Sequence, residues 1–372
     1  MRIGIEGRTL QGRRYGVARY TKNLLSWFVR LEPENHYILY LSEPIDLRGF
    51  DQANLSFQVI GSDRIPLAWR HLYLPLRMKR DKVDIHFSPS YFVPLFKVCP
   101  YVVVVHDISF KAHPEWFARD LRMKFDDLFW PRVRAAERII TVSEYSKKEI
   151  VRLLGADPEK ITVIYEAAEE FFKPIEDKER LKSIMEKYGV SEPFILTAGS
   201  IHTRRNLERL IEAVAIAGRR LGLTPWLLIL GTPAPFSPPV DIWGTAAKFG
   251  IQQFIQHIEY VPEEDLLLLY NACALFAYPS LYEGFGLPVI EAMACGCPVL
   301  CSNLTSLPEV GGEAVVYFDP FEVESIAQAI CEIFEDDNLK NRLKEEGKKR
   351  ASSFSWERAA RETLKVFHEI AG

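Results

Sequence analysis

The chain has 372 residues, of which 48% are hydrophobic and 26% are charged, and its formal net charge is −4. These values are typical of a globular protein with two domains of ordinary size, and they exclude a disordered or fibrous chain. No apolar run reaches the length of a membrane span, about 18 residues, and segment 1–10 lacks the apolar core of a signal peptide. The sequence therefore predicts a cytoplasmic protein.

The charge is unevenly distributed along the chain. Residues 1–172 carry 26 Lys and Arg against 22 Asp and Glu, a net charge of +4, and the remaining residues carry −8. A mildly basic first half favours anionic partners such as phospholipid headgroups or a lipid diphosphate. It is too weak for the concentrated basic face of a nucleic-acid-binding protein, so we predict no nucleic-acid partner.

Short apolar runs alternate with longer amphipathic runs throughout the chain. This alternation predicts parallel sheets covered by helices on both faces, the doubly wound α/β class. The predicted strands form two series: 2–6, 36–41, 56–60, 85–88, 101–105, 138–142 and 161–164, then 194–198, 226–230, 255–258, 275–277, 298–301 and 314–318.

The loop after the first predicted strand, 6–25, contains several glycines but no nucleotide fingerprint. Their spacing does not fit G-x-G-x-x-G and no Walker lysine is present, which argues against a dehydrogenase or a P-loop NTPase. Its basic residues Arg13, Arg14 and Arg19 suit either an anionic acceptor or a solvated surface.

The apolar strand 101–105 runs into His106 and Asp107. The carboxyl edge of a parallel sheet is where such folds place their sites. A hydrolytic His–Asp pair would also need a Ser or Cys nucleophile motif, which the sequence lacks. His106 is therefore a candidate residue of the site.

The break between the two strand series predicts the domain boundary. Segment 171–192 is charged and contains Pro174, and we place a hinge at 167–174. The predicted domains are 1–170 and 175–354, and the sequence leaves open whether the last helix, 355–372, packs back on the first. Two doubly wound domains would face a central cleft at the carboxyl ends of their strands, where ligands bind.

The second series begins with a strand that runs into AGSIHTRRN, residues 198–206. Asn206 is the predicted N-cap of the next helix, and Arg204 and Arg205 stand directly before it. Fixed cations there suit the negative charge that develops on a diphosphate leaving group. Arg204 and Arg205 are therefore catalytic candidates and Ser200 a binding candidate, with an ordinary basic loop as the alternative.

The strongest pattern is YEGFGLPVIEAMACG, residues 282–296. Pro288 suits the first position of a helix, so the preceding N–H groups form an anion site at its N-terminus. Glu283 and Glu291 suit sugar and ribose hydroxyl groups on either side of a phosphate, although isolated acids at a helix start are often only solvated. The phosphate-binding candidates are Gly284, Phe285, Gly286 and Leu287.

Three of the six cysteines lie close together, at positions 295, 297 and 301. No His or acidic ligand flanks them, so they are typical of small buried core residues. This favours neither a zinc site nor a disulfide framework, and we predict no metal site.

The second half resembles the retaining, family-4-type glycosyltransferases with the GT-B fold almost letter for letter, including their E-x7-E element. In the first half the resemblance depends mainly on Gly16, His106 and TVSEYSKKEI (141–150). The family usually has Arg-Lys where this chain has Arg204-Arg205, a change that keeps both charges. Three segments carry the match: EGFGLP (283–288), EAMACG (291–296) and LPEV (307–310).

The resemblance implies two Rossmann-like domains and transfer of a hexose, with retention, from a nucleotide diphosphate sugar to a saccharide or lipid-linked saccharide. It implies no cofactor or metal, because arginines and helix N–H groups replace a divalent cation. Similar bacterial enzymes transfer mannose and other hexoses into surface polysaccharides. We therefore expect mannose from a GDP-linked donor first, with UDP-linked donors left open.

The resemblance also implies roles for residues outside the main motif. Gly16 is expected to approach donor phosphate and acceptor. His106 is expected to contact the donor sugar, largely through its backbone carbonyl, as a binding residue and not as a general base. Tyr260 and Val261 are expected to hold the nucleotide base, and Ser280, just before the acidic loop, joins the donor-binding set.

Several alternatives remain open at this point. A nucleotide-sugar epimerase, a sugar phosphorylase of the same fold and a non-catalytic nucleotide-sugar sensor would share these motifs. Two basic amphipathic stretches, 69–80 and 116–134, suit either packed helices or a membrane surface. Peripheral contact with the inner face of the cell membrane is thus also open.

Overall fold

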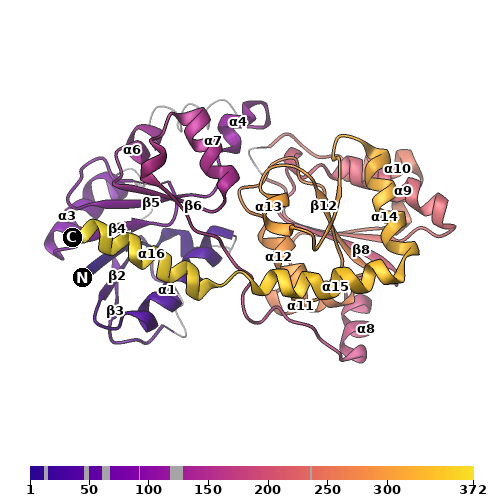
Figure 1. Ribbon diagram of the computed structural model, residues 1–372, viewed down its shortest axis with the longest axis horizontal. Helices are drawn as coiled ribbons and strands as arrows, with labels where there is room; N and C mark the ends of the chain where they lie inside the picture. Colours follow the sequence, from indigo (N-terminus) through magenta and orange to yellow (C-terminus); the bar gives the residue numbers. More distant parts are fainter. Residues whose placement is uncertain (12–15, 46–49, 61–67, 92, 118–128, 235–236) are drawn as a thin grey trace. The chain divides into compact units, whose positions relative to one another are not determined.

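The computed structural model describes residues 1–11, 16–45, 50–60, 68–91, 93–117, 129–234 and 237–372. The chain divides into two compact units, each with one parallel sheet (Figure 1). Unit 1 comprises Met1–Ala112, Arg119–Glu166 and Ser355–Gly372, and unit 2 comprises His113–Ala118 and Ala167–Phe354.

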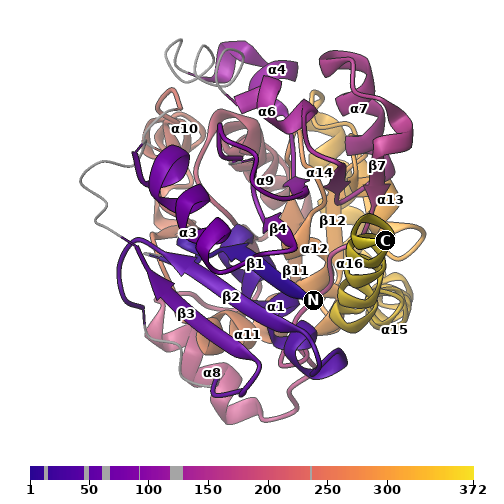
Figure 2. The ribbon, with the colours of Figure 1, turned by 90° about the vertical axis from the view of Figure 1, so that its left-hand side faces the viewer.

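The sheet of unit 1 has the order β3-β2-β1-β4-β5-β6-β7, with every described pair parallel. β1 lies between β2 and β4, so Ile3 pairs with Tyr37 on one side and Ile85 on the other. Figure 2 shows β3, β2, β1 and β4 side by side. The strands are β1 (Arg2–Glu6), β2 (His36–Leu41), β3 (Leu55–Val59), β4 (Ile85–Ser88), β5 (Tyr101–Val105), β6 (Arg138–Thr141) and β7 (Ile161–Val163).

The last helix of the chain completes unit 1. It packs against the first helix, where the rings of Phe28 and Phe367 meet edge to face at 5.7 Å. The Ser355 hydroxyl caps it by accepting from the Arg358 N–H at 3.3 Å. The helices are α1 (Gly16–Leu31), a short π-helix (Trp69–Tyr73), α3 (Leu74–Arg80), α4 (Ser109–Ala112), α6 (Trp130–Arg134), α7 (Glu144–Leu154) and α16 (Trp356–Ala371).

The sheet of unit 2 has the order β10-β9-β8-β11-β12-β13 and is also parallel. Its strands are β8 (Phe194–Ala198), β9 (Trp226–Leu230), β10 (Ile255–Ile258), β11 (Leu275–Tyr278), β12 (Val299–Ser302) and β13 (Val316–Phe318). Its helices are α8 (Lys178–Lys187), α9 (Leu207–Leu221), α10 (Ile242–Phe249), α11 (Glu263–Ala272), α12 (Leu287–Ala294), α13 (Leu307–Gly311), α14 (Val323–Glu335) and α15 (Asp337–Ser352).

One apolar face of α9 anchors the core of unit 2. Leu210, Ile211 and Val214 are buried there at the helical spacing that the sequence predicts, and they belong to one cluster with Ile326 and Ile330 of α14. All thirteen predicted strands exist, with boundaries within two residues of those expected. The doubly wound α/β prediction is therefore confirmed.

Strand order fixes where each sheet can hold a ligand. In unit 2 the chain proceeds from β8 to β9 and β10, then returns to the other side of β8 with β11. The crevice beyond the carboxyl ends of β8 and β11 is the topological switch point, the usual ligand position in such sheets. The loops that begin at Gly199 and Pro279 meet there.

Candidate active site

The two loops at the switch point of unit 2 are joined through Arg204. Its carbonyl oxygen accepts from the Leu281 N–H at 2.8 Å, and its Nη1 donates to the Tyr282 carbonyl at 3.1 Å. The basic loop after β8 and the acidic loop after β11 are thus held together by a backbone hydrogen bond and a side-chain hydrogen bond.

Glu283 is the centre of a buried polar cluster in this structure. Its Oε1 accepts from Arg205 Nη1 at 2.5 Å and from Ser280 Oγ at 2.5 Å. Its Oε2 lies 3.7 Å from Arg204 Nη1. Glu283, Arg205 and Ser280 are each less than 10% exposed. Buried charges are stable when they are paired and hydrogen-bonded, so this cluster fixes an acid between two cations.

Tyr278, the last residue of β11, also contacts Arg205. Its hydroxyl accepts from Arg205 Nη1, and the guanidinium carbon lies 4.8 Å from the ring centre. Burial raises the pKa of the Tyr278 hydroxyl; the nearby arginines oppose this effect and Glu283 adds to it. Tyr278 therefore stays neutral and serves Arg205 as a hydrogen-bond acceptor.

Two glycines bring the backbone close to this cluster. Gly199 directly follows β8 with φ +129°, and a Cβ there would lie 2.7 Å from Arg205 Nη2. Gly231 follows β9 with φ +153°, and a Cβ there would lie 2.0 Å from the Gly199 carbonyl oxygen. Only glycine fits these positions without displacement. The guanidinium of Arg205 is thus packed directly on the end of the sheet.

The short turn that carries the arginines is Thr203–Arg205, and Asn206 directly follows it. His202 Nδ1 accepts from the Arg204 N–H at 3.2 Å. Asn206 stands at the N-cap position of α9 in a left-handed conformation, φ +58°, without a side-chain cap bond. Its amide donates instead to the Pro320 carbonyl at 2.7 Å. Asn206 is therefore the N-cap residue, as predicted, but its Oδ1 accepts from Arg209 Nη1 at 2.8 Å in place of a backbone N–H of the first turn.

The glycine-rich loop ends at the start of α12, as the sequence predicts. Gly286 is the N-cap with φ +117° and the helix begins at Leu287, so Pro288 is its second residue, not its first. Ser306 Oγ lies 3.0 Å from the Glu283 carbonyl oxygen and 2.8 Å from that of Phe285. Gly284, Phe285 and Gly286 are buried. Ser306, the residue before α13, therefore holds the backbone of this loop by hydrogen bonds to two of its carbonyl groups.

Glu291 makes a hydrogen bond that is separate from those of the Glu283 cluster. It is 1% exposed, and its Oε2 accepts from the Tyr270 hydroxyl of α11 at 3.1 Å. The sequence leads us to expect this carboxylate to reach back toward the glycine-rich loop. Its hydrogen bond to Tyr270 links α12 to α11, and its role toward a ribose stays a prediction.

The remaining donor-binding candidates of unit 2 lie in loops that follow strands. Ser200 is exposed directly after β8 and Gly199. Tyr260 and Val261 lie between β10 and α11, where Tyr260 is 62% exposed and Val261 is buried. The carboxyl edge of the sheet thus carries these residues together with the Arg204–Glu283 pair.

Two candidates, His106 and Gly16, belong to unit 1. His106 directly follows β5, with its Nε2 2.9 Å from the Pro89 carbonyl oxygen and its Nδ1 3.2 Å from Glu166 Oε1. Gly16 is the first residue of α1, and a Cβ there would meet open space. Arg13 and Arg14 lie outside the described residues.

Sequence reasoning missed several residues that hold the site together. Thr305 Oγ1 accepts from the Glu283 N–H at 3.1 Å, next to the Ser306 contacts. The ring of His113 stacks on Trp116 at 3.9 Å and meets the Tyr282 ring edge-on at 5.7 Å. Thr305 precedes the matched LPEV segment, a usable signal, whereas nothing local in the sequence connects His113 to the acidic loop.

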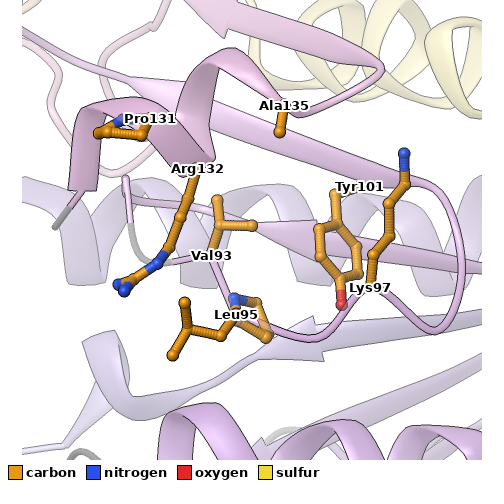
Figure 3. A pocket seen from close by; sticks show the side chains of 8 residues that line it. Val93, Leu95, Lys97, Tyr101, Pro131, Arg132 and Ala135 are labelled. Atoms are coloured by element: carbon orange, nitrogen blue, oxygen red, sulfur yellow. The ribbon is translucent and has the colours of Figure 1, made fainter.

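A cavity of about 270 Å³ lies at the opposite edge of the sheet of unit 1. Tyr101, in its wall, is the first residue of β5, whereas His106 follows the last. Figure 3 shows Arg132 and Lys97 on opposite sides of this cavity, with apolar side chains between them. Other wall residues are Val93, Leu95 and Pro131.

Metal and membrane binding can be assessed from the cysteines and the helices that the structure describes. Cys273 and Cys297 have their sulfur atoms 3.2 Å apart in the core of unit 2. Across the described ranges, no three His, Cys, Asp or Glu side chains converge as a set of metal ligands. In the same part of the chain, no helix is both long and apolar enough to span a membrane.

Family models match both halves of the sequence. The model of Glycosyltransferase Family 4 matches residues 15–168, and that of Glycosyl transferases group 1 matches residues 177–350. O-antigen chain mannosyltransferase B of Escherichia coli is 33% identical over 290 residues, which cover 77% of this chain and 75% of that protein. The serotype-specific mannosyltransferase WbdA of E. coli is 30% identical over 287 residues, 76% of this chain but 34% of that protein.

Solved structures share the whole fold at low identity. Sucrose-phosphate synthase of Thermosynechococcus elongatus superposes with a TM-score of 0.77 at 16% identity, covering 99% of this chain and 98% of that one. WaaG, a glycosyltransferase involved in lipopolysaccharide biosynthesis, gives 0.74 at 15% identity, covering 98% and 99%. Alr3699/HepE of Anabaena, in complex with UDP and glucose, gives 0.75 at 16% identity, covering 99% of each chain.

These comparisons confirm the family and the fold that the sequence motifs imply. Both family models name glycosyltransferases, and the relative at 33% identity spans three quarters of each chain. The chain therefore belongs to the group 1 glycosyltransferases and has their two-domain, α/β GT-B fold.

Proposed function

We propose that this glycosyltransferase moves mannose, with retention at the anomeric carbon, from a nucleotide diphosphate donor to a saccharide or lipid-linked saccharide. The observation that carries the proposal is the buried cluster of Glu283 with Arg204 and Arg205 at the switch point of unit 2. Relatives named as mannosyltransferases at 30–33% identity support mannose as the sugar. GDP is the first candidate for the nucleotide and UDP the second.

The cluster supplies complementary groups for such a donor. Glu283 is a hydrogen-bond acceptor suited to sugar hydroxyl groups, and the two guanidinium groups suit the diphosphate in bidentate geometry. The N–H groups at the start of α12 face the same negative charge. Groups that are fixed before the reaction stabilise charge on the leaving diphosphate more strongly in the transition state than in the ground state.

We further propose that no divalent cation takes part. Arg204 and Arg205 provide two fixed positive charges where a metal would otherwise neutralise the leaving group. We assign Glu283 a binding role and not that of a covalent nucleophile, because its Oε1 accepts hydrogen bonds from Arg205 and Ser280 and its charge is shared with two arginines. A same-face displacement, in which the leaving phosphate takes the acceptor proton, fits this arrangement.

We also propose a peripheral membrane contact through unit 1. Helical segment 69–80 holds four Lys or Arg and no acid, and its Leu72, Tyr73 and Leu76 are 43–60% exposed. Leu95 and Phe96 are more than half exposed, and the Leu95 N–H donates to His71 Nδ1 at 3.3 Å. An apolar surface with a basic border suits anionic lipid headgroups. Trp69, Leu74 and Met78 of the same segment are buried, so part of it packs and part is exposed.

A donor screen tests the proposed function. The true donor stabilises the native state by mass action, so GDP-mannose should raise the melting temperature more than UDP-, ADP- or dTDP-sugars. Product analysis with acceptor saccharides, in excess chelator, should then show a new α-linked mannose. Conversion of the donor without an acceptor would indicate an epimerase, a need for inorganic phosphate a phosphorylase, and binding without turnover a sensor.

The Glu283→Gln variant completes this test. Glutamine keeps the size of the side chain but removes the charge between the arginines, so transfer should fall by at least about 100-fold. Near-normal transfer by this variant, or a strict requirement for manganese or magnesium, would contradict the proposal.

A further inference from the structure

The ring of His106 is held by two oxygen atoms of unit 1. Nε2 lies 2.9 Å from the Pro89 carbonyl oxygen after β4, and Nδ1 lies 3.2 Å from Glu166 Oε1 after β7. The His106 and Glu166 side chains are 16% and 6% exposed. Both partners accept hydrogen bonds, so both ring nitrogens must carry hydrogen for both contacts to be made. The geometry therefore selects the imidazolium form.

The surroundings of the ring agree with this protonation state. Burial lowers the pKa of His106. The opposing effects together are larger, so the pKa is raised overall: they come from the hydrogen bond and charge of Glu166, the Pro89 carbonyl and the charge of Asp107. From α1, Tyr20 meets the ring edge-on at 4.7 Å. Its hydroxyl is buried and has no hydrogen-bond partner within the described residues. Glu166 and Asp107 are thus the negative charges that face His106.

These contacts restrict what His106 can do. A general base needs a ring nitrogen with a free lone pair that can reach the proton. Here Nε2 faces Pro89 and Nδ1 faces Glu166, so neither is available. What remains for a ligand is the backbone of His106 at the end of β5, and the position of that backbone depends on how firmly the ring is held.

We propose that Glu166 is a positioning residue for sugar transfer: it fixes the His106 ring and thereby the backbone that ends β5. This inference rests on the proposed function and on the expectation, implied by the sequence resemblance, that the backbone of His106 contacts the donor sugar. Glu166 is well placed for the role because it ends the Arg119–Glu166 part of unit 1, directly before the long segment Ala167–Phe354 of unit 2. The chain returns at Ser355, and Trp356 packs on Tyr20 at 5.7 Å. The same small cluster therefore contains His106, the residue at which the chain leaves unit 1 for Ala167–Phe354, and a residue next to its return at Ser355.

The Glu166→Gln substitution separates positioning from mere packing. Glutamine keeps the length and an acceptor oxygen for Nδ1, but it removes the charge that favours the imidazolium. Glu149→Gln is the matched control, because Glu149 is also a nearly buried carboxylate of unit 1 and it pairs with Arg152 at 2.7 Å. Glu166→Asp keeps the charge on a shorter side chain and serves as the conservative variant.

Two measurements on the full chain give independent results. Nuclear magnetic resonance titration of labelled histidine, assigned with His106→Gln, should show a lower His106 pKa in Glu166→Gln and an unchanged one in Glu149→Gln. Transfer kinetics should show kcat falling by roughly 10- to 100-fold in Glu166→Gln, with its loss at high pH starting at lower pH than in the wild type. Glu166→Asp should restore the pH profile.

The results that overturn the proposal are distinct from those that overturn the function. If the wild type is active and Glu166→Gln has the same kcat and pH profile, the role of Glu166 is excluded and the proposed function stands. No transfer by the wild type with any donor would contradict the function and, with it, this role. If Glu166→Gln does not fold, Glu166→Ala takes its place, because it also removes the charge, and an unchanged kcat and pH profile in that variant would overturn the proposal.

Discussion

Gly199→Ala is the sharpest test of the arginine cluster, because its effect follows from one measured contact. The added Cβ would lie 2.7 Å from Arg205 Nη2 and 2.8 Å from its Cζ, whereas ordinary contact begins near 3.4 Å. The guanidinium must therefore retreat by about 0.7 Å. This retreat disturbs the contacts that Arg205 Nη1 makes with Glu283 and Tyr278.

The expected magnitudes differ for stability and for catalysis. An alanine with φ +129° stores roughly 1–3 kcal/mol of backbone strain, and a flexible side chain adds little when it moves. For a group aimed at the transition state, a misplacement of about 1 Å is worth up to about 100-fold in rate. We therefore expect kcat to fall roughly 10- to 100-fold in a protein that remains folded.

Gly250→Ala supplies the matched control in the same unit. Gly250 follows α10 with φ +72°, and a Cβ there would have no atom within 4 Å. This variant should lose about 1 kcal/mol from strain alone and keep its kcat. Melting temperature and steady-state transfer are measured for both variants. If Gly199→Ala loses no more kcat than Gly250→Ala, the geometric argument for Arg205 is refuted.

Two further predictions concern other parts of the molecule. Tyr278→Phe removes an acceptor for Arg205 Nη1 from a buried site, so it should lower the free energy of unfolding by about 1–3 kcal/mol. It should also weaken donor binding measured by calorimetry, and an unchanged donor affinity would contradict the role of Tyr278. Leu76→Asp combined with Phe96→Asp should abolish co-sedimentation with anionic vesicles, whereas Trp243→Asp, at an exposed position of α10, should not; equal binding by both would contradict the membrane contact.

The sequence was sufficient for the elements because their signals are local. Alternating apolar runs predicted both sheets, and the motif around Glu283 predicted a loop before a helix, as observed. The partners of Glu283 were accessible only in part. Arg205 was identified by its chemistry, but Tyr278 resembles any other residue at the end of a buried strand. Only the pairing of β11 with β8 brings its hydroxyl to Arg205.

Asn206 and Glu291 show the opposite limit, where the local signal was clear but incomplete. Asn206 has the residue type and place of an N-cap, yet its amide donates to the carbonyl of Pro320, far along the chain. Glu291 has the spacing of an acid that faces the glycine-rich loop, yet it accepts from Tyr270. Both side chains therefore also have a partner from a distant segment, and the sequence alone does not specify which helices and loops become neighbours.

The composition of the cluster explains how an acid can stand in a site for a diphosphate. A lone carboxylate would repel phosphate, and a buried one would favour its neutral form. Glu283 is instead shared between Arg205 at 2.5 Å and Arg204 at 3.7 Å, so these three side chains together carry one positive charge. The excess charge still attracts a diphosphate, while the paired carboxylate stays oriented for hydroxyl groups. The two functions therefore depend on each other: without the second arginine, the acid would cancel the attraction that brings the donor to it.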